Sequence, residues 1–98
     1  MTLREAAELM IEYNKWRRLQ IKESKNIREN ITPAIKKVST FLFWNQEEIR
    51  ILKPHAAIFD TYLKFRSGQL EQEPVGFATK VGESIDFVSN YILKEIHD

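Results

Sequence analysis

Residues 77–96 read FATKVGESIDFVSNYILKEI and carry the clearest structural signal in the chain. Their large apolar residues recur every three or four positions, which places them on one face of an α-helix. That face consists of Phe77, Val81, Ile85, Val88, Ile92 and Ile96. The spacing predicts an amphipathic helix that begins between Pro74 and Thr79 and needs a partner surface to cover its apolar side.

A second helical pattern opens the chain. The sequence Thr2-Leu3-Arg4-Glu5 matches a capping box, in which a Thr and a Glu side chain each accept a hydrogen bond from the other's backbone amide. Apolar residues then continue on one helical face as far as Ile21. We therefore expect a first helix from Leu3 to about Lys25.

Two more helices are expected in the middle of the chain. Thr32-Pro33 is typical of an N-cap followed by a first-turn proline, and that helix should end near Trp44. The next helix should follow residues 45–48, with a kink or break just before Pro54, and should end at Gly68 in a left-handed cap. Residues 69–74 are polar and read as a loop, and hairpin turns or sustained alternation typical of strands are nearly missing.

The chain also resembles itself when it is shifted by half its length. A shift of 49 residues places Tyr13–Arg17 on Tyr62–Arg66, and a shift of 50 places Ile31–Leu42 on Val81–Ile92. Any two amphipathic helices can be slid into such a match, but here both helices of each half agree at nearly one offset. We therefore predict an all-α fold: a compact four-helix bundle made of two pseudo-twofold-related helical hairpins. It forms a single domain, 1–98, with an internal repeat of 3–45 and 52–97.

Composition narrows the class of protein. The chain has 98 residues, 43% of them apolar and 30% charged, which is ordinary for a globular domain and excludes disorder. Fifteen Lys and Arg against fourteen Asp and Glu argue against a histone-like protein and against an acidic DNA mimic. The chain has no cysteine, no secretory signal and no membrane span, so we expect it in the cytoplasm.

Arginine occurs twice on a predicted core face, at Arg17 and at its counterpart Arg66. A guanidinium there either extends into solvent at the end of the bundle or meets a carboxylate. The carboxylates available for such an ion pair are Asp86, Glu83, Asp60 and Glu12.

Surplus aromatic and basic residues suggest a binding surface. Trp16 and Phe65 lie on a second apolar line, and Phe43 and Trp44 lie off the apolar face of their helix. They either fill a wide core or anchor a partner, because aromatic side chains dominate the energetics of interfaces. The basic residues Lys15, Arg18, Lys22 and Lys25 follow a 3-4-3 spacing, which predicts a stripe on the first helix that is solvated or contacts an acidic surface.

Catalytic signals are weak. His55 and His97 lack the spacing of a metal site, and no catalytic motif is present, so we expect no catalytic residue, no metal and no cofactor. The one acidic pattern is formed by Glu5, Glu8, Glu12, Glu83 and Asp86. It is similar to the magnesium sites of all-helical nucleotide pyrophosphohydrolases, which remain a remote alternative.

Two short motifs, Tyr13-Asn14-Lys15-Trp16-Arg17-Arg18 and Gly82-Glu83-Ser84-Ile85-Asp86, resemble those of small helical proteins encoded by bacteriophages and prophages. Those proteins show Asn-x-Trp-Arg-Arg, a loop, and then Gly-x-Ala-Ile-Asp at the start of a second helix, whereas this chain splits the two motifs between its halves. The family has no assigned activity. The resemblance implies a phage setting and, by analogy, binding and inhibition of a host protein.

These observations together predict a non-enzymatic interaction protein. Its partner would be a host protein, bound through Trp16, Phe43, Trp44 and Phe65 and through the basic stripe of Lys15, Arg18, Lys22 and Lys25. A second hypothesis is that the chain forms a homodimer through the same aromatic residues. Binding of nucleic acid by the basic stripe is the alternative function.

Overall fold

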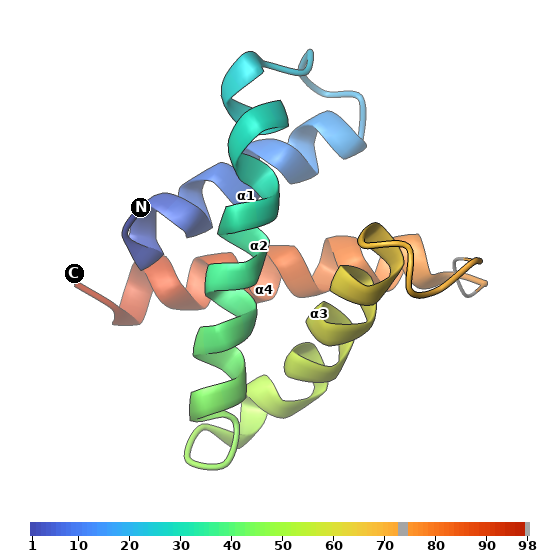
Figure 1. Ribbon diagram of the computed structural model, residues 1–98. Helices are drawn as coiled ribbons and strands as arrows, with labels where there is room; N and C mark the ends of the chain where they lie inside the picture. Colours follow the sequence, from blue (N-terminus) through green and yellow to red (C-terminus); the bar gives the residue numbers. More distant parts are fainter. Residues whose placement is uncertain (73–74, 98) are drawn as a thin grey trace.

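Helices make up most of the described chain, residues 1–72 and 75–97 of a computed structural model (Figure 1). They are α1 (Leu3–Arg17), α2 (Lys25–Asn45), the 3₁₀ turn η1 (Arg50–Leu52), α3 (Lys53–Arg66) and α4 (Phe77–Glu95). No strand occurs within these residues, so the predicted all-α class is confirmed. The same residues contain no helix whose length and apolar content would let it cross a membrane.

The helices form two antiparallel pairs that pack across each other. In the first pair, Arg4 near the start of α1 donates to the carbonyl oxygens of Leu93 (2.7 Å) and Ile96 (2.8 Å) at the end of α4. Arg17 at the end of α1 donates to the carbonyl oxygen of Ala78 (3.0 Å) at the start of α4. The second pair, α2 and α3, also runs in opposite directions, and α2 crosses in front of α4 in Figure 1.

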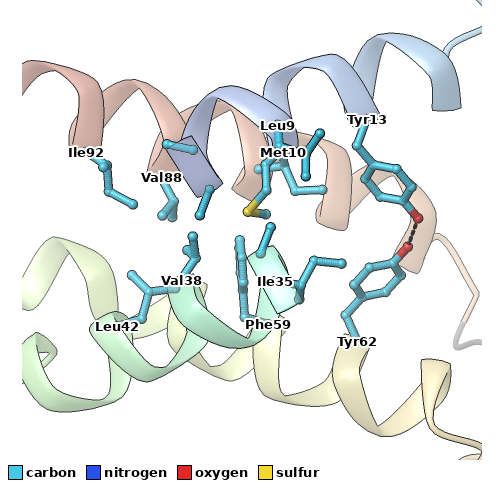
Figure 2. Close-up of a cluster of buried hydrophobic side chains, with 14 of the residues drawn as sticks. Leu9, Met10, Tyr13, Ile35, Val38, Leu42, Phe59, Tyr62, Val88 and Ile92 are labelled. Atoms are coloured by element: carbon cyan, nitrogen blue, oxygen red, sulfur yellow. Dashed lines mark hydrogen bonds between the residues drawn. The ribbon is translucent and has the colours of Figure 1, made fainter. Parts of the chain in front are cut away.

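The contacts between helices are consistent with the predicted pseudo-twofold relation of the two halves. α1 and α3 each contact both α2 and α4, so exchanging α1 with α3 and α2 with α4 preserves the pattern of contacts. The counterpart positions of the two halves also share the core (Figure 2). The buried counterpart pairs are Met10 and Phe59, Ile35 and Ile85, Val38 and Val88, and Leu42 and Ile92.

The end of α1 differs from the prediction. The helix stops at Arg17 rather than near Lys25, because Leu19 takes the left-handed conformation (φ 61°) and reverses the chain. The amides of Leu19 and Gln20 donate to the carbonyl oxygens of Trp16 and Lys15, both at 2.9 Å, which closes the helix end. Leucine rarely adopts this conformation, so the sequence carried no signal for this end.

The start of α2 also differs. The helix begins at Lys25, where the side chain of Ser24 accepts a hydrogen bond from the Ile27 amide (3.1 Å). Pro33 therefore lies inside the helix and not in its first turn. The prediction at Thr32-Pro33 was wrong because the Ser24 cap adds two helical turns before the proline, and Ile27 packs in the core.

Four other expected boundaries are confirmed. α2 ends at Asn45, next to the predicted Trp44, and the chain breaks at η1 just before Pro54, which lies in the first turn of α3. Gly68 is left-handed (φ 82°) after the end of α3, and α4 begins at Phe77. Residues 73, 74 and 98 lie outside the described part, so for Glu73 and Pro74 the predicted loop stays a prediction.

The corrected boundaries remove the basic stripe. Lys15 lies on α1, Arg18 caps that helix, Lys22 lies in the following loop and Lys25 opens α2. Because these four residues do not share a helix, the 3-4-3 spacing does not place them on one face.

Candidate functional site

The most exposed aromatic side chains flank a groove between α2 and α3. Phe43 and Trp44, in the last turn of α2, are 62% and 75% exposed. Their rings lie 5.4 Å apart in an edge-to-face arrangement. Leu42 faces the core, and each following residue turns by about 100° around the helix, so Phe43 and Trp44 point away from it.

Beside these aromatic rings the groove opens into a hollow of ≈ 560 Å³. Its far wall comes from α3 and includes Lys53, Ala57 and Asp60. Small residues such as Ala57 leave room for a side chain from outside, and the aromatic rings supply apolar surface. We call this part the aromatic end of the groove.

A second hollow continues along the same two helices. It measures ≈ 410 Å³ and is lined by Thr32, Lys36, Asp60, Leu63, Lys64, Arg66, Ser67 and Gln69. Asp60 lines both hollows, so they are neighbours along one groove. Three cations and one carboxylate line this second hollow, and we call it the cationic end.

Arg66 is held firmly at the cationic end. Its Nη1 donates to the Tyr13 hydroxyl oxygen (3.1 Å) and its Nη2 to the Thr32 hydroxyl oxygen (2.8 Å). The guanidinium also lies 5.8 Å and 5.7 Å from the ring centres of Tyr13 and Tyr62. Three elements, α1, α2 and α3, thus fix one side chain.

The two tyrosines form a hydrogen-bonded pair at one end of the core. Tyr13 from α1 and Tyr62 from α3 share a hydroxyl–hydroxyl hydrogen bond (Figure 2). Arg17, the counterpart of Arg66, lies 5.9 Å from both ring centres. Burial raises the pKa of Tyr13 above its ordinary value, and the hydrogen bond with Tyr62 raises it further, so Tyr13 stays neutral.

Arg17 and Arg66 were expected either to extend into solvent at the end of the bundle or to pair with a carboxylate, and neither expectation describes them fully. Within the described residues, Arg17 and Arg66 make no ion pair with Asp86, Glu83, Asp60 or Glu12. Instead they cover the tyrosine pair and bind uncharged oxygens. A guanidinium over an aromatic ring gains electrostatic energy from the ring face, which partly replaces an ion pair.

Asp86 instead joins α4 to the end of α1 through other residues. It accepts hydrogen bonds from Arg18 (2.7 Å) and from Asn14 (2.8 Å). Asn14 also donates to the carbonyl oxygen of Gly82 (3.0 Å). A Cβ on Gly82 would lie 3.4–3.5 Å from the side chains of Arg18, Arg17 and Asn14, which is ordinary van der Waals contact, so this position does not require glycine.

This network brings together the two short motifs, which are far apart in the sequence. Asn14, Arg17 and Arg18 come from the first motif, and Gly82 and Asp86 come from the second. Their contacts hold α1 and α4 together, which is a structural role. Arg18, predicted to contact a partner, has Asp86 as its own partner.

The residues predicted to bind a partner do not form one surface. Trp16 and Phe65 are half-buried against the core, and the Trp16 ring lies 5.6 Å from that of Tyr13. Lys22 and Lys25 lie at one end of α2 and Phe43 and Trp44 at the other, about 30 Å apart for a helix of this length. Lys15 is exposed on α1.

Among the described residues, four cations share the groove with Phe43 and Trp44: Lys53 lines the aromatic end, and Lys36, Lys64 and Arg66 line the cationic end. Sequence analysis missed Lys36 and Lys64, because an exposed lysine on a helix is an ordinary solvated residue. One signal was available: the shift of 50 residues places Lys36 on Asp86, which reverses the charge at a counterpart position.

A histidine and a serine also meet, between α3 and α4. His55 Nδ1 lies 2.6 Å from the Ser84 hydroxyl oxygen, and the His55 ring stacks on Phe87 at 4.5 Å. Burial lowers the pKa of His55. The Ser84 side chain is fully buried, so this pair has the geometry of a core hydrogen bond. In residues 1–72 and 75–97, no three His, Asp or Glu side chains gather in a way that could hold a metal ion.

The groove thus combines an aromatic end and a cationic end on the same two helices, and we take it as the candidate site. In comparisons with known proteins, no family model, no curated protein and no solved structure matches this chain.

Proposed function

We propose that this chain is a non-enzymatic, cytoplasmic interaction protein that binds a segment of another protein in the groove between α2 and α3. The observation that carries the proposal is the exposed pair of Phe43 and Trp44 beside a hollow of ≈ 560 Å³. Large aromatic side chains left in solvent on a small domain are typical anchors of protein interfaces.

The chemistry of the groove defines the partner segment. An apolar side chain of the partner would pack on Phe43 and Trp44 at the aromatic end. Acidic groups of the same segment would face Lys36, Lys64 and Arg66 at the cationic end. Charge complementarity of this kind favours the correct partner and speeds its association. The resemblance to phage-encoded proteins makes a host protein the first partner to test, with inhibition of that protein as the expected effect.

A capture experiment tests the proposal. The immobilised full chain is exposed to host lysate, and the proteins retained by the wild type are compared with those retained by Trp44→Ala. Loss of an interface tryptophan costs about 2 kcal/mol or more, so the retained partner should bind roughly 30-fold more weakly. Ile51→Ala is the matched control, because Ile51 is a large apolar residue, 57% exposed, that does not line the groove.

The salt dependence of binding separates this proposal from its alternative. Binding anchored on aromatic rings should change little between 50 and 200 mM salt, because salt screens charges and not apolar contacts. Binding to nucleic acid should weaken by about 0.9 log units per log unit of salt for each phosphate contacted. Capture that is equally reduced in Trp44→Ala and Ile51→Ala would contradict the assignment of the groove.

Self-association is the remaining explanation for the exposure of Phe43 and Trp44. Sedimentation of the purified chain at micromolar concentration distinguishes it, since the proposal expects a monomer. A dimer that dissociates in Trp44→Ala would show that a second copy occupies the groove.

A further inference from the structure

The cationic end of the groove has more positive charge than its own residues balance. Lys64 pairs with Asp60 at 3.1 Å. Lys36 and Arg66 have no carboxylate within ion-pair distance among the described residues. Two uncompensated cations therefore line one hollow of ≈ 410 Å³.

The pseudo-twofold symmetry shows what is missing there. Around Arg17 the corresponding hollow, ≈ 310 Å³, is lined by Asn14, Arg17, Arg18 and Gly82. Beside it the chain supplies its own anion, because the Asp86 carboxylate accepts hydrogen bonds from Asn14 and Arg18. At the counterpart position on α2 stands Lys36. One half of the molecule thus contains an internal carboxylate, and the other half has a cation in its place.

Arg66 is already arranged for binding. Tyr13, Tyr62 and Thr32 hold its guanidinium, so a ligand would immobilise little that is not already fixed. Two N–H groups of the five are used, and the others remain available. The Thr32 hydroxyl accepts from Arg66, while its own hydrogen has no acceptor among the described residues and can donate to a ligand.

We propose that this cationic end is a binding site for a phosphate monoester. Such a group carries about −1.5 to −2 charges at pH 7, which matches the two uncompensated cations Lys36 and Arg66. Its three terminal oxygens match Arg66, Lys36 and the Thr32 hydroxyl. A carboxylate has one charge and two oxygens and would leave one of these groups without a partner.

As a statement about the partner, this inference rests on the proposed function, since the phosphate would belong to a phosphorylated side chain of the bound segment. The site itself needs no partner to be tested. Adjacent apolar surface at Phe43 and Trp44 would then select which phosphorylated segment binds.

The test is an NMR titration of the ¹⁵N-labelled full chain with O-phosphoserine at pH 7.5 and constant ionic strength. We expect saturable shifts of the amides of Thr32, Lys36 and Arg66. Lys36→Gln should weaken binding about fivefold, the effect of losing roughly 1 kcal/mol. Lys37→Gln is the matched control, because Lys37 is also exposed on α2 but does not line the hollow, and it should leave the affinity unchanged.

A second variant tests the positioning of Arg66. Arg66→Lys keeps the charge but cannot bind Tyr13 and Thr32 with a fork of donors, so it should weaken phosphoserine binding with a well-dispersed spectrum retained. Acetate that binds as tightly as phosphoserine would overturn the phosphate assignment. Equal weakening by Lys37→Gln, or shifts that do not saturate, would show a general cationic surface and overturn the site. Capture of a partner that depends on Trp44, without phosphoserine binding, would remove this site and leave the proposed function standing.

Discussion

At the residue scale, the hydroxyl pair of Tyr13 and Tyr62 is a buried hydrogen bond between side chains that joins the two halves. The two residues have unequal surroundings. Tyr13 also accepts a hydrogen bond from Arg66, whereas Tyr62 has no second hydroxyl partner among the described residues. Removing one hydroxyl therefore has a different consequence on each side.

We expect Tyr13→Phe to destabilise the fold more than Tyr62→Phe. The first variant leaves both the Tyr62 hydroxyl and an Arg66 N–H without a partner, and should lower the free energy of unfolding by about 2 kcal/mol. The second leaves Tyr13 bound to Arg66 and should cost about 1 kcal/mol. Urea unfolding followed by circular dichroism measures both values.

The double variant is the control for this comparison. Once both hydroxyls are gone, no polar group of the pair is left buried, so the two losses should not add, and the coupling should be about 1 kcal/mol. Additive losses would mean that the two hydroxyls act independently. The sequence placed both tyrosines at counterpart positions but could not show that they touch, because periodicity gives a face and not a distance.

At the scale of the element, the ends of α1 and α3 are counterparts with the same geometry. Leu19 and Gly68 occupy the same left-handed position after each helix, with φ angles of 61° and 82°. The amides of Gly68 and Gln69 donate to Phe65 (3.2 Å) and Lys64 (2.9 Å), as Leu19 and Gln20 do to Trp16 and Lys15. Glycine adopts this conformation freely and leucine does not.

Leu19→Gly should therefore stabilise the protein by about 1 kcal/mol, because it relieves backbone strain. Leu19 is 90% exposed, so few contacts are lost. For a domain of this size the gain corresponds to a rise of roughly 4–8 °C in the melting temperature. Differential scanning calorimetry of the purified variant measures it.

Gly68→Leu is the matched reverse change. A Cβ on Gly68 would meet no atom within 4 Å, so the expected loss of about 1 kcal/mol comes from the backbone conformation alone. If Leu19→Gly lowers the melting temperature, Leu19 makes a contact that outweighs its strain.

The ends of α1 and α3 differ in how well the sequence predicts them. Gly68 correctly predicted the end of α3, because a glycine after an amphipathic segment is a recognised signal for the end of a helix. Leu19 carried no such signal, and the expected helix ran on to Lys25. The error at Pro33 has the opposite cause, since a strong local signal was outweighed by the Ser24 cap and by burial of Ile27.

At the scale of the whole molecule, the apolar faces and the repeat were enough to predict four helices in two related halves. They could not predict which cations share a groove with Phe43 and Trp44, because that depends on how α2 and α3 pack. Lys36 and Arg66 are 30 residues apart in the sequence and line one hollow only in the folded chain. The predicted basic stripe failed for a different reason: α1 ends at Arg17, so the members of the stripe belong to different elements.

The partial burial of His55 makes the stability of the whole fold depend on pH. Burial lowers the folded-state pKa of His55 below the unfolded value of about 6.5. The unfolded chain therefore binds a proton first as the pH falls, so this histidine favours the folded state above pH 6.5. Its contribution is lost as the pH falls through the lower, folded-state pKa.

We expect the free energy of unfolding to fall between pH 7.5 and pH 5, and part of that fall to disappear in His55→Gln. The glutamine can keep a hydrogen bond to Ser84 but takes up no proton in this range. His97→Gln is the matched control, because His97 is exposed beyond the end of α4. Chemical unfolding at several pH values compares the three proteins, and carboxylates common to all of them cancel in the comparison. A His55→Gln curve parallel to that of the wild type would show that His55 is as easily protonated in the folded chain as in the unfolded one.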